Sequence, residues 1–114
     1  MNTLLLDSLT AAKVEKSLPS RSGLTALSSF FGALSDVTRL KILSALTVSK
    51  MCVNDLSVVT GLNQTTVSHQ LRILRDAHIV DGVRQGKVIF YCVTADIPAI
   101  MNTAVRAVMN MGMN

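Results

Sequence analysis

Tryptophan is absent from this 114-residue chain, and aromatic residues make up only 4% of it. Any hydrophobic core must therefore be built from aliphatic side chains and methionine, which favours helices packed on helices. Apolar residues nevertheless account for 49% of the sequence, which is more than one small core can bury. We therefore expect a single compact chain that hides part of its apolar surface in a subunit interface.

Long apolar runs are also absent. Lys, Arg or Asp interrupts every apolar segment well before the roughly 20 residues that a membrane-spanning helix requires. The first residues lack the basic start and the long apolar stretch of a secretion signal. The sequence therefore predicts a cytoplasmic protein with no membrane partner, in which the two cysteines are reduced thiols.

Groupings of catalytic residues are missing as well. No Ser/His/Asp, Cys/His or paired-carboxylate arrangement lies on elements expected to converge, and no glycine-rich phosphate loop is present. We therefore predict that the protein is not an enzyme. The net charge is +4, and the segment 72–87 holds Arg72, Arg75, Arg84 and Lys87 against Asp76 and Asp81. Such a segment is typical of a protein with a polyanionic partner.

Apolar periodicity predicts the order of the secondary structure elements. The predicted helices cover residues 4–18, 24–34, 37–46, 54–59, 63–77 and 97–111, and the predicted strands cover residues 79–83 and 88–93. A basic loop at 84–87 connects the strands into a hairpin. A break at residues 17–23 divides the chain into an N-terminal helix or arm, residues 1–23, and one domain, residues 24–114.

Residues 54–77 carry the signs of a helix-turn-helix. Gly61 can adopt the left-handed conformation that ends a helix, and Asn63 is a good N-cap for the next one. Val67, Leu71 and Leu74 recur on one face of that second helix, where we expect them to be buried. With the hairpin that follows, the predicted fold class is mainly α with a small β-hairpin wing (α+β), a winged helix-turn-helix that forms a homodimer.

The second helix of this motif is expected to read DNA. At about 100° per residue, the buried stripe leaves Thr65, His69 and Arg72 on the opposite face. The predicted DNA contacts are Asn63, Gln64, Thr65, Thr66, Ser68, His69, Arg72 and Arg75 from the helix, and Arg84, Gln85 and Lys87 from the wing. Such side chains can hydrogen-bond base edges or phosphates. The alternative is that the basic residues form only a solvated face.

Several segments together resemble the ArsR/SmtB family of metal- and stress-sensing repressors. They are residues 34–43, 51–56, 63–75 and 86–91, and the run Val67–Arg75 (VSHQLRILR) is specific in this setting. The resemblance covers about residues 24–111. It implies a homodimer held by the first and last helices, a double-stranded DNA operator with two half-sites, and repression relieved when a ligand alters the dimer.

The function expected from this resemblance is a sequence-specific DNA-binding transcriptional repressor. Release of DNA would be triggered by a metal, a thiol-reactive compound or another stress ligand. Two alternatives stay open at this point. One is a winged-helix adaptor whose basic face binds an acidic protein, and the other is a repressor that is independent of ligands or responds to redox conditions.

The family's metal sites are incomplete in this chain. A Cys-Val-Cys run of the arsenic type corresponds here to Cys52–Asn54, which lacks one thiolate. The cadmium, lead and zinc type keeps Cys52 and Asp55, but residues 1–30 contain no Cys or His, which leaves two ligands where tetrahedral zinc needs four. The zinc and cobalt type keeps Asp96 beside Ile97, with Val108 and Met111 at the other positions.

The sensing residues are therefore tentative: Cys52, Asp55 and Cys92. Cys52 is either a ligand of a thiophilic metal ion, a reactive thiol or a small buried side chain. Cys92 is either part of the core or, with Cys52, a redox-sensitive disulfide. Methionines near the C-terminus, Met101, Met109, Met111 and Met113, favour interface packing over a copper(I) site. No cofactor is expected beyond a thiophilic metal ion at Cys52.

Overall fold

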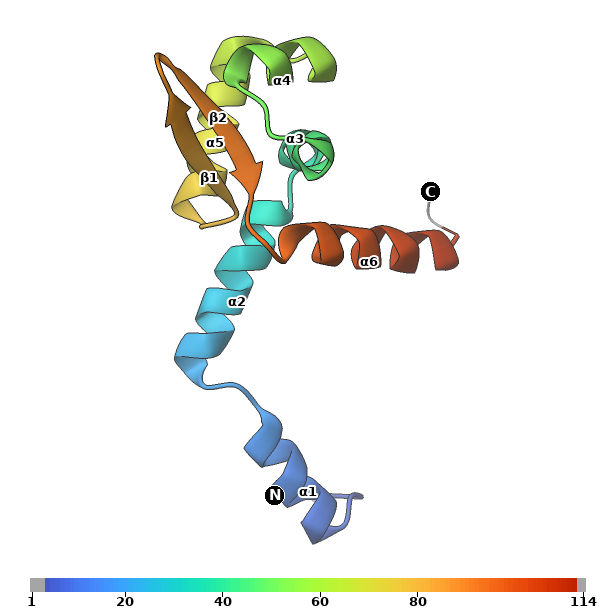
Figure 1. Cartoon of the computed structure of the whole chain (residues 1–114). Helices are drawn as coiled ribbons and strands as arrows, with labels where there is room; N and C mark the ends of the chain where they lie inside the picture. Colours follow the sequence, from blue (N-terminus) through green and yellow to red (C-terminus); the bar gives the residue numbers. More distant parts are fainter. Residues whose placement is uncertain (1–3, 113–114) are drawn as a thin grey trace.

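The computed structural model describes residues 4–112, which form six helices and one antiparallel hairpin (Figure 1). In chain order these are α1 (Ser8–Ser17), α2 (Arg21–Leu34), α3 (Val37–Val48), α4 (Val53–Thr60), α5 (Gln64–Asp76), β1 (Val80–Gln85), β2 (Val88–Val93) and α6 (Ile97–Asn110). The order confirms the predicted fold class, a winged helix-turn-helix. Met113, one of the methionines considered for copper, lies outside the described residues.

Side-chain caps decide where the first two helices begin. The carboxylate of Asp7 accepts hydrogen bonds from the amide and the hydroxyl of Thr10, both at 2.8 Å, so α1 begins at Ser8 and not at residue 4. These bonds hold the pKa of Asp7 below its usual value. Ser20 caps α2 through the amide of Gly23 at 3.1 Å, so α2 begins three residues before the predicted start at residue 24. The predicted break shortens accordingly to residues 18–20.

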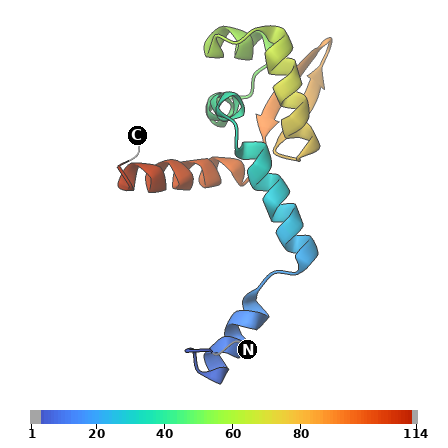
Figure 2. The same ribbon diagram turned by 180° about the vertical axis from the view of Figure 1, so that it is seen from behind.

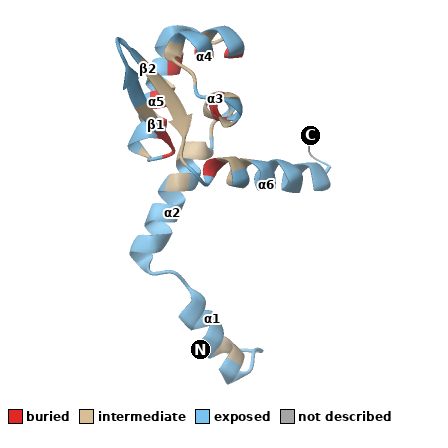
Figure 3. Cartoon of the chain, in the orientation of Figure 1, coloured by how far each residue is buried: buried red, intermediate tan, exposed pale blue. Residues whose placement is uncertain are grey.

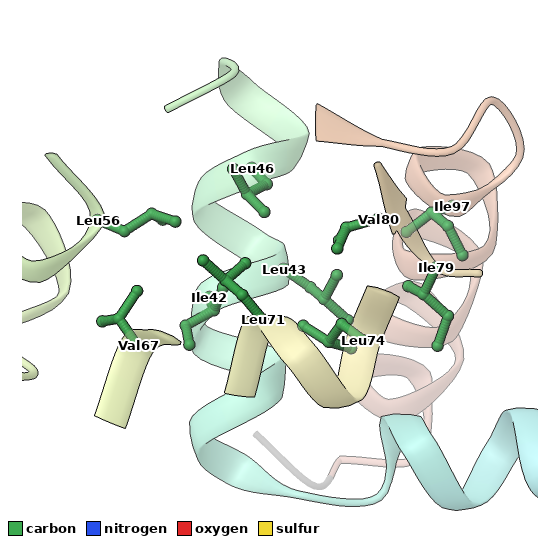
Figure 4. Close-up of a cluster of buried hydrophobic side chains, with 10 residues drawn as sticks. All are labelled: Ile42, Leu43, Leu46, Leu56, Val67, Leu71, Leu74, Ile79, Val80 and Ile97. Atoms are coloured by element: carbon green, nitrogen blue, oxygen red, sulfur yellow. The ribbon is translucent and has the colours of Figure 1, made fainter. Parts of the chain in front are cut away.

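The hydrophobic core lies where α3, seen end-on in Figure 2, packs against α4, α5 and β2. Figure 4 shows the buried side chains that fill it, which are Ile42, Leu43, Leu46, Leu56, Val67, Leu71, Leu74, Ile79, Val80 and Ile97. Val67, Leu71 and Leu74 are at most 1% exposed, which confirms the predicted inner face of α5. We call α3, α4, α5 and the hairpin the head of the molecule.

The hairpin is longer and its turn is tighter than the sequence suggested. Arg84 pairs with Ile89 and Gln85 with Val88, so both residues belong to β1 and only two residues form the turn. Gly86 takes the left-handed conformation there, with φ of 67°, which lets a two-residue turn close the ladder. Met51, between α3 and α4, exchanges two backbone hydrogen bonds with Tyr91 and so joins β2 to the segment that connects these two helices.

Outside the head, three helices leave apolar side chains in solvent. Figure 3 shows that most of α1, α2 and α6 is exposed, and the molecule measures 61 × 33 × 23 Å as a result. The exposed apolar side chains of α2 and α6 include Leu24, Leu27, Phe31, Val105, Val108 and Met109. Among residues 4–112, no helix combines the length and the apolar character needed to cross a membrane.

Candidate nucleic-acid interface

The outer face of α5 gathers five of the predicted DNA-contacting residues. Gln64, Thr65, Ser68, His69 and Arg72 are all exposed and together line an open hollow of about 490 Å³. These side chains offer hydroxyl, amide, imidazole and guanidinium groups, which can pair with the donors and acceptors of base edges. The arrangement is a polar helix face with space in front of it.

Local sequence fixes how this face is presented. The left-handed Gly61, with φ of 74°, ends α4 as predicted, and the side chain of Asn63 caps α5 by accepting from the amide of Thr66 at 2.8 Å. The side-chain Nε2 of Gln64 also donates to Oδ1 of Asn54 on α4 at 3.0 Å, which sequence reasoning missed. The buried stripe and these end contacts together determine the rotation of α5 about its axis.

The other predicted contacts occupy the edges of this face. Asn63 uses its side-chain oxygen for the cap, Thr66 is half-buried, and Arg75 is exposed on the flank of α5. From the wing, Arg84 and Gln85 are exposed near the end of β1, and Lys87 is exposed in the turn. Lys87 also lies beside the start of α4, where it lines a second hollow with Cys52 and Tyr91.

Comparison with known proteins matches this helical head to a regulatory family. Residues 36–81, which include all of α4 and α5, match the family described as bacterial regulatory protein, arsR family. The cadmium resistance transcriptional regulatory protein CadC of Listeria innocua is 33% identical over 90 residues, which cover 78% of this chain and 70% of that protein. The chain belongs to the ArsR family.

Two further similarities agree with this assignment. The transcriptional repressor SmtB homolog of Synechocystis sp. is 42% identical over 65 residues, which cover 57% of this ArsR-family chain and 49% of that protein. The match thus spans about half of that relative. A homodimeric winged helix-turn-helix DNA-binding domain of Mycobacterium bovis superposes with a TM-score of 0.69 at 23% identity, covering 97% of this chain and 94% of that one. That likeness shows the fold.

A relative named for cadmium resistance invites a test of this chain's own ligands. Among residues 4–112, no three His, Cys, Asp or Glu side chains gather closely enough to hold a metal ion. Cys52 is half-buried just before α4, and Asp55 is exposed in the first turn of that helix. Two ligands do not complete a tetrahedral site. The described residues of one ArsR-family chain therefore do not fit a structural or sensory zinc or cadmium ion.

The two thiols lie on different sides of the wing. Cys52 shares its hollow of about 350 Å³ with Tyr91 and Ile89 of β2. Cys92 follows Tyr91, so alternation along the strand turns its side chain to the opposite face, where its sulfur lies 3.9 Å from the carbonyl oxygen of Asp81. Both cysteines are free thiols. The geometry does not bring them together as a redox-sensitive pair.

One basic residue near the interface has partners that sequence reasoning did not find. Arg39 belongs to α3, and its side chain is half-buried and contacts two other helices. Its guanidinium reaches the end of α2 and also Gln70 on α5, next to His69. No local pattern marks such a residue, because its partners lie 6 and 31 positions away along the chain.

Proposed function

We propose that this chain is a homodimeric, sequence-specific DNA-binding repressor that reads a double-stranded operator with α5. One observation carries the proposal: α5 is buried along Val67, Leu71 and Leu74 and open along its polar face. The major groove admits an α-helix and displays a distinct donor and acceptor pattern for each base pair. Thr65, His69 and Arg72 are the residues proposed to read bases, with Gln64 and Ser68 beside them.

The wing and the ends of α5 supply the contacts that do not depend on sequence. The cap at Asn63 leaves the amino end of α5, with its free amides, available to a phosphate. Thr66 and Arg75 flank the reading face, and Arg84, Gln85 and Lys87 extend the positive surface along the wing. Contacts of this kind position a protein on the duplex and make its affinity depend on salt.

The homodimer is proposed to form through the N- and C-terminal helices. The exposed apolar side chains of α1 and α6 support it, since residues such as Leu9, Val105 and Met109 are each more than half exposed in the single chain. The homodimeric state of the Mycobacterium bovis domain also favours it. Residues 1–23 would then act as an arm on a DNA-binding and dimerisation domain of residues 24–114, in the cytoplasm where bacterial DNA lies.

Selection from a random duplex library, followed by titration at fixed salt, tests this function. We expect one sequence to bind at least ~10³-fold more tightly than random DNA, with two half-sites about one helical turn apart. Sedimentation of the free protein should give a dimer mass. Equally weak binding of all sequences would refute a repressor, and retention of an acidic protein in place of DNA would favour an adaptor.

Replacing Lys87 with alanine should weaken binding to operator and to random DNA by similar factors. Lys87 lies in the wing turn, where a flexible ammonium can reach a phosphate but reads no base edge. Because one phosphate contact is lost, the slope of log K against log salt should become shallower by about 1. Titrations between low and physiological salt measure it, and Arg21→Ala, at the far end of α2, is the matched control.

The release of DNA is proposed to begin at Cys52, with Asp55 and Cys92 in secondary roles. Cys52 precedes α4, makes no capping bond with its side chain and opens into the hollow beside the wing. A bulky or charged adduct on its sulfur would occupy this hollow and push the start of α4 and β2 apart, and both elements pack next to the reading helix or its hairpin. A thiol-reactive compound is therefore the trigger class that the residues favour, because they do not complete a metal site.

Alkylation of the thiol tests this trigger. With the parent protein, a thiol-specific alkylating reagent should release operator DNA, and Cys52→Ser should abolish the effect while it still binds the operator. Cys92→Ser is the matched control and should respond like the parent, since its sulfur faces the other side of the hairpin. Release that persists in Cys52→Ser would exclude this residue as the sensor.

A further inference from the structure

The guanidinium of Arg39 joins three helices. It belongs to α3, and its Nε donates to the carbonyl oxygen of Ala33 at 2.6 Å while Nη2 donates to that of Gly32 at 3.4 Å, both on the last turn of α2. Its Nη1 donates to Oε1 of Gln70 on α5 at 3.1 Å. Each of its three nitrogens thus has a partner, and the planar fork of arginine fixes the directions between them.

The α2 contacts are strong for a physical reason. The last four carbonyls of a helix have no amide partners within the helix and carry its negative end. Ala33 and Gly32 belong to that turn, so a cation placed there is favoured both by hydrogen bonding and by the dipole. Arg39 therefore fixes the end of α2 to α3, and its bond with Gln70 holds the guanidinium in the orientation that reaches both carbonyls.

The hydrogen bond between Arg39 and Gln70 of α5 connects this arginine to the reading helix. Gln70 is half-buried on the flank of α5, does not line the open hollow, and directly follows His69. Among residues 4–112, its bond with Arg39 joins the two most distant positions of any side-chain hydrogen bond. The buried stripe and the end contacts orient α5 within the head, and the directed hydrogen bond from Arg39 adds a restraint on the reading face relative to α2.

We infer that Arg39 is a positioning residue that couples α2 to the reading helix α5 through Gln70. The inference rests on the proposed function, since the rotation of α5 matters to DNA only if α5 reads it. Leu24, Leu27 and Phe31 of α2 are exposed, so a partner subunit can contact this helix. A shift of α2 is transmitted along this path to His69 and Arg72. The coupling selects the operator over random DNA and contributes little to affinity for phosphate.

The first test needs no DNA. In Gln70→Leu, amide hydrogen exchange of Ser35 should accelerate at least about threefold, because its amide donates to the same Gly32 carbonyl that Arg39 holds. Asn54→Ala is the matched control: it also removes a side-chain hydrogen bond from α5, but one that leads to α4. In Asn54→Ala, the amide of Ser35 should exchange at the same rate as in the parent. An unchanged rate in Gln70→Leu would overturn the coupling.

The second test measures specificity. Gln70→Leu should lower the ratio of operator to random-DNA affinity about 2- to 30-fold, with an unchanged dimer mass and melting temperature. Gln70→Glu keeps an acceptor for Arg39 and should retain the parent's ratio, and Arg39→Lys combined with Gln70→Leu should lower it no further than Arg39→Lys alone. A ratio unaltered in Gln70→Leu would overturn the inference. A parent protein that prefers no DNA sequence would refute the proposed repressor function. The hydrogen-exchange rate of Ser35 in Gln70→Leu would still decide whether Arg39 couples α2 to α5.

Discussion

Replacing Leu71 with alanine should lower the free energy of unfolding by about 2–5 kcal/mol, the largest effect that we expect on stability. Leu71 is 1% exposed and lies in the middle of α5, within the cluster that joins this helix to α3. Removing its branched end both loses buried apolar surface and leaves a cavity, since the flanking helices can close only part of the space. Equilibrium denaturation with urea measures the change.

Val48→Ala is the matched control for this measurement. Val48 is the last residue of α3 and is 86% exposed, so its truncation should change the free energy of unfolding by no more than about 0.5 kcal/mol. Both variants must be compared at one protein concentration, because dimer formation would add to the apparent stability. A Leu71→Ala protein as stable as the parent would show that α5 is held by something other than its aliphatic stripe.

The same stripe explains why the fold and the reading face could be predicted from the sequence. Helical periodicity depends only on residues three and four positions apart, so Val67, Leu71 and Leu74 were enough to define the buried face and, by exclusion, the exposed face of α5. The turn was equally local: Gly61 ends one helix and Asn63 caps the next. Side-chain types on the open face then indicated the partner class.

Features that depend on spatial neighbours were beyond such patterns. The hydrogen bonds of Arg39 with α2 and of Gln64 with Asn54 join residues on different helices, and no sequence periodicity relates such residues. The start of α2 at Arg21 was missed because the serines and proline of that segment resemble a loop, whereas Ser20 acts as a cap. The two thiols could be assigned to opposite sides of the wing only once the register of β2 was known.

Among changes on the reading face, Arg72→Ala should have the largest effect on DNA binding. Arg72 is exposed on the polar face of α5 and lines its hollow. A guanidinium in the major groove donates two hydrogen bonds to the acceptors of one guanine, which is the commonest specific contact to a base. Losing it should cost about 1–3 kcal/mol, or about 5- to 150-fold in affinity for the operator.

The effects of Arg72→Ala on the affinities for operator and random DNA together show whether Arg72 contacts a base or a phosphate. A residue that reads a base should lose affinity for the operator while random DNA is affected much less, and the variant should no longer discriminate at one base-pair position in each half-site. Arg21→Ala removes the same charge at the far end of α2 and should leave both affinities near those of the parent. If Arg72→Ala lowers the affinities for operator and random DNA by the same factor, Arg72 contacts a phosphate and not a base. One that binds the operator like the parent would mean that α5 does not enter the groove, since the buried stripe leaves it no other polar face to present.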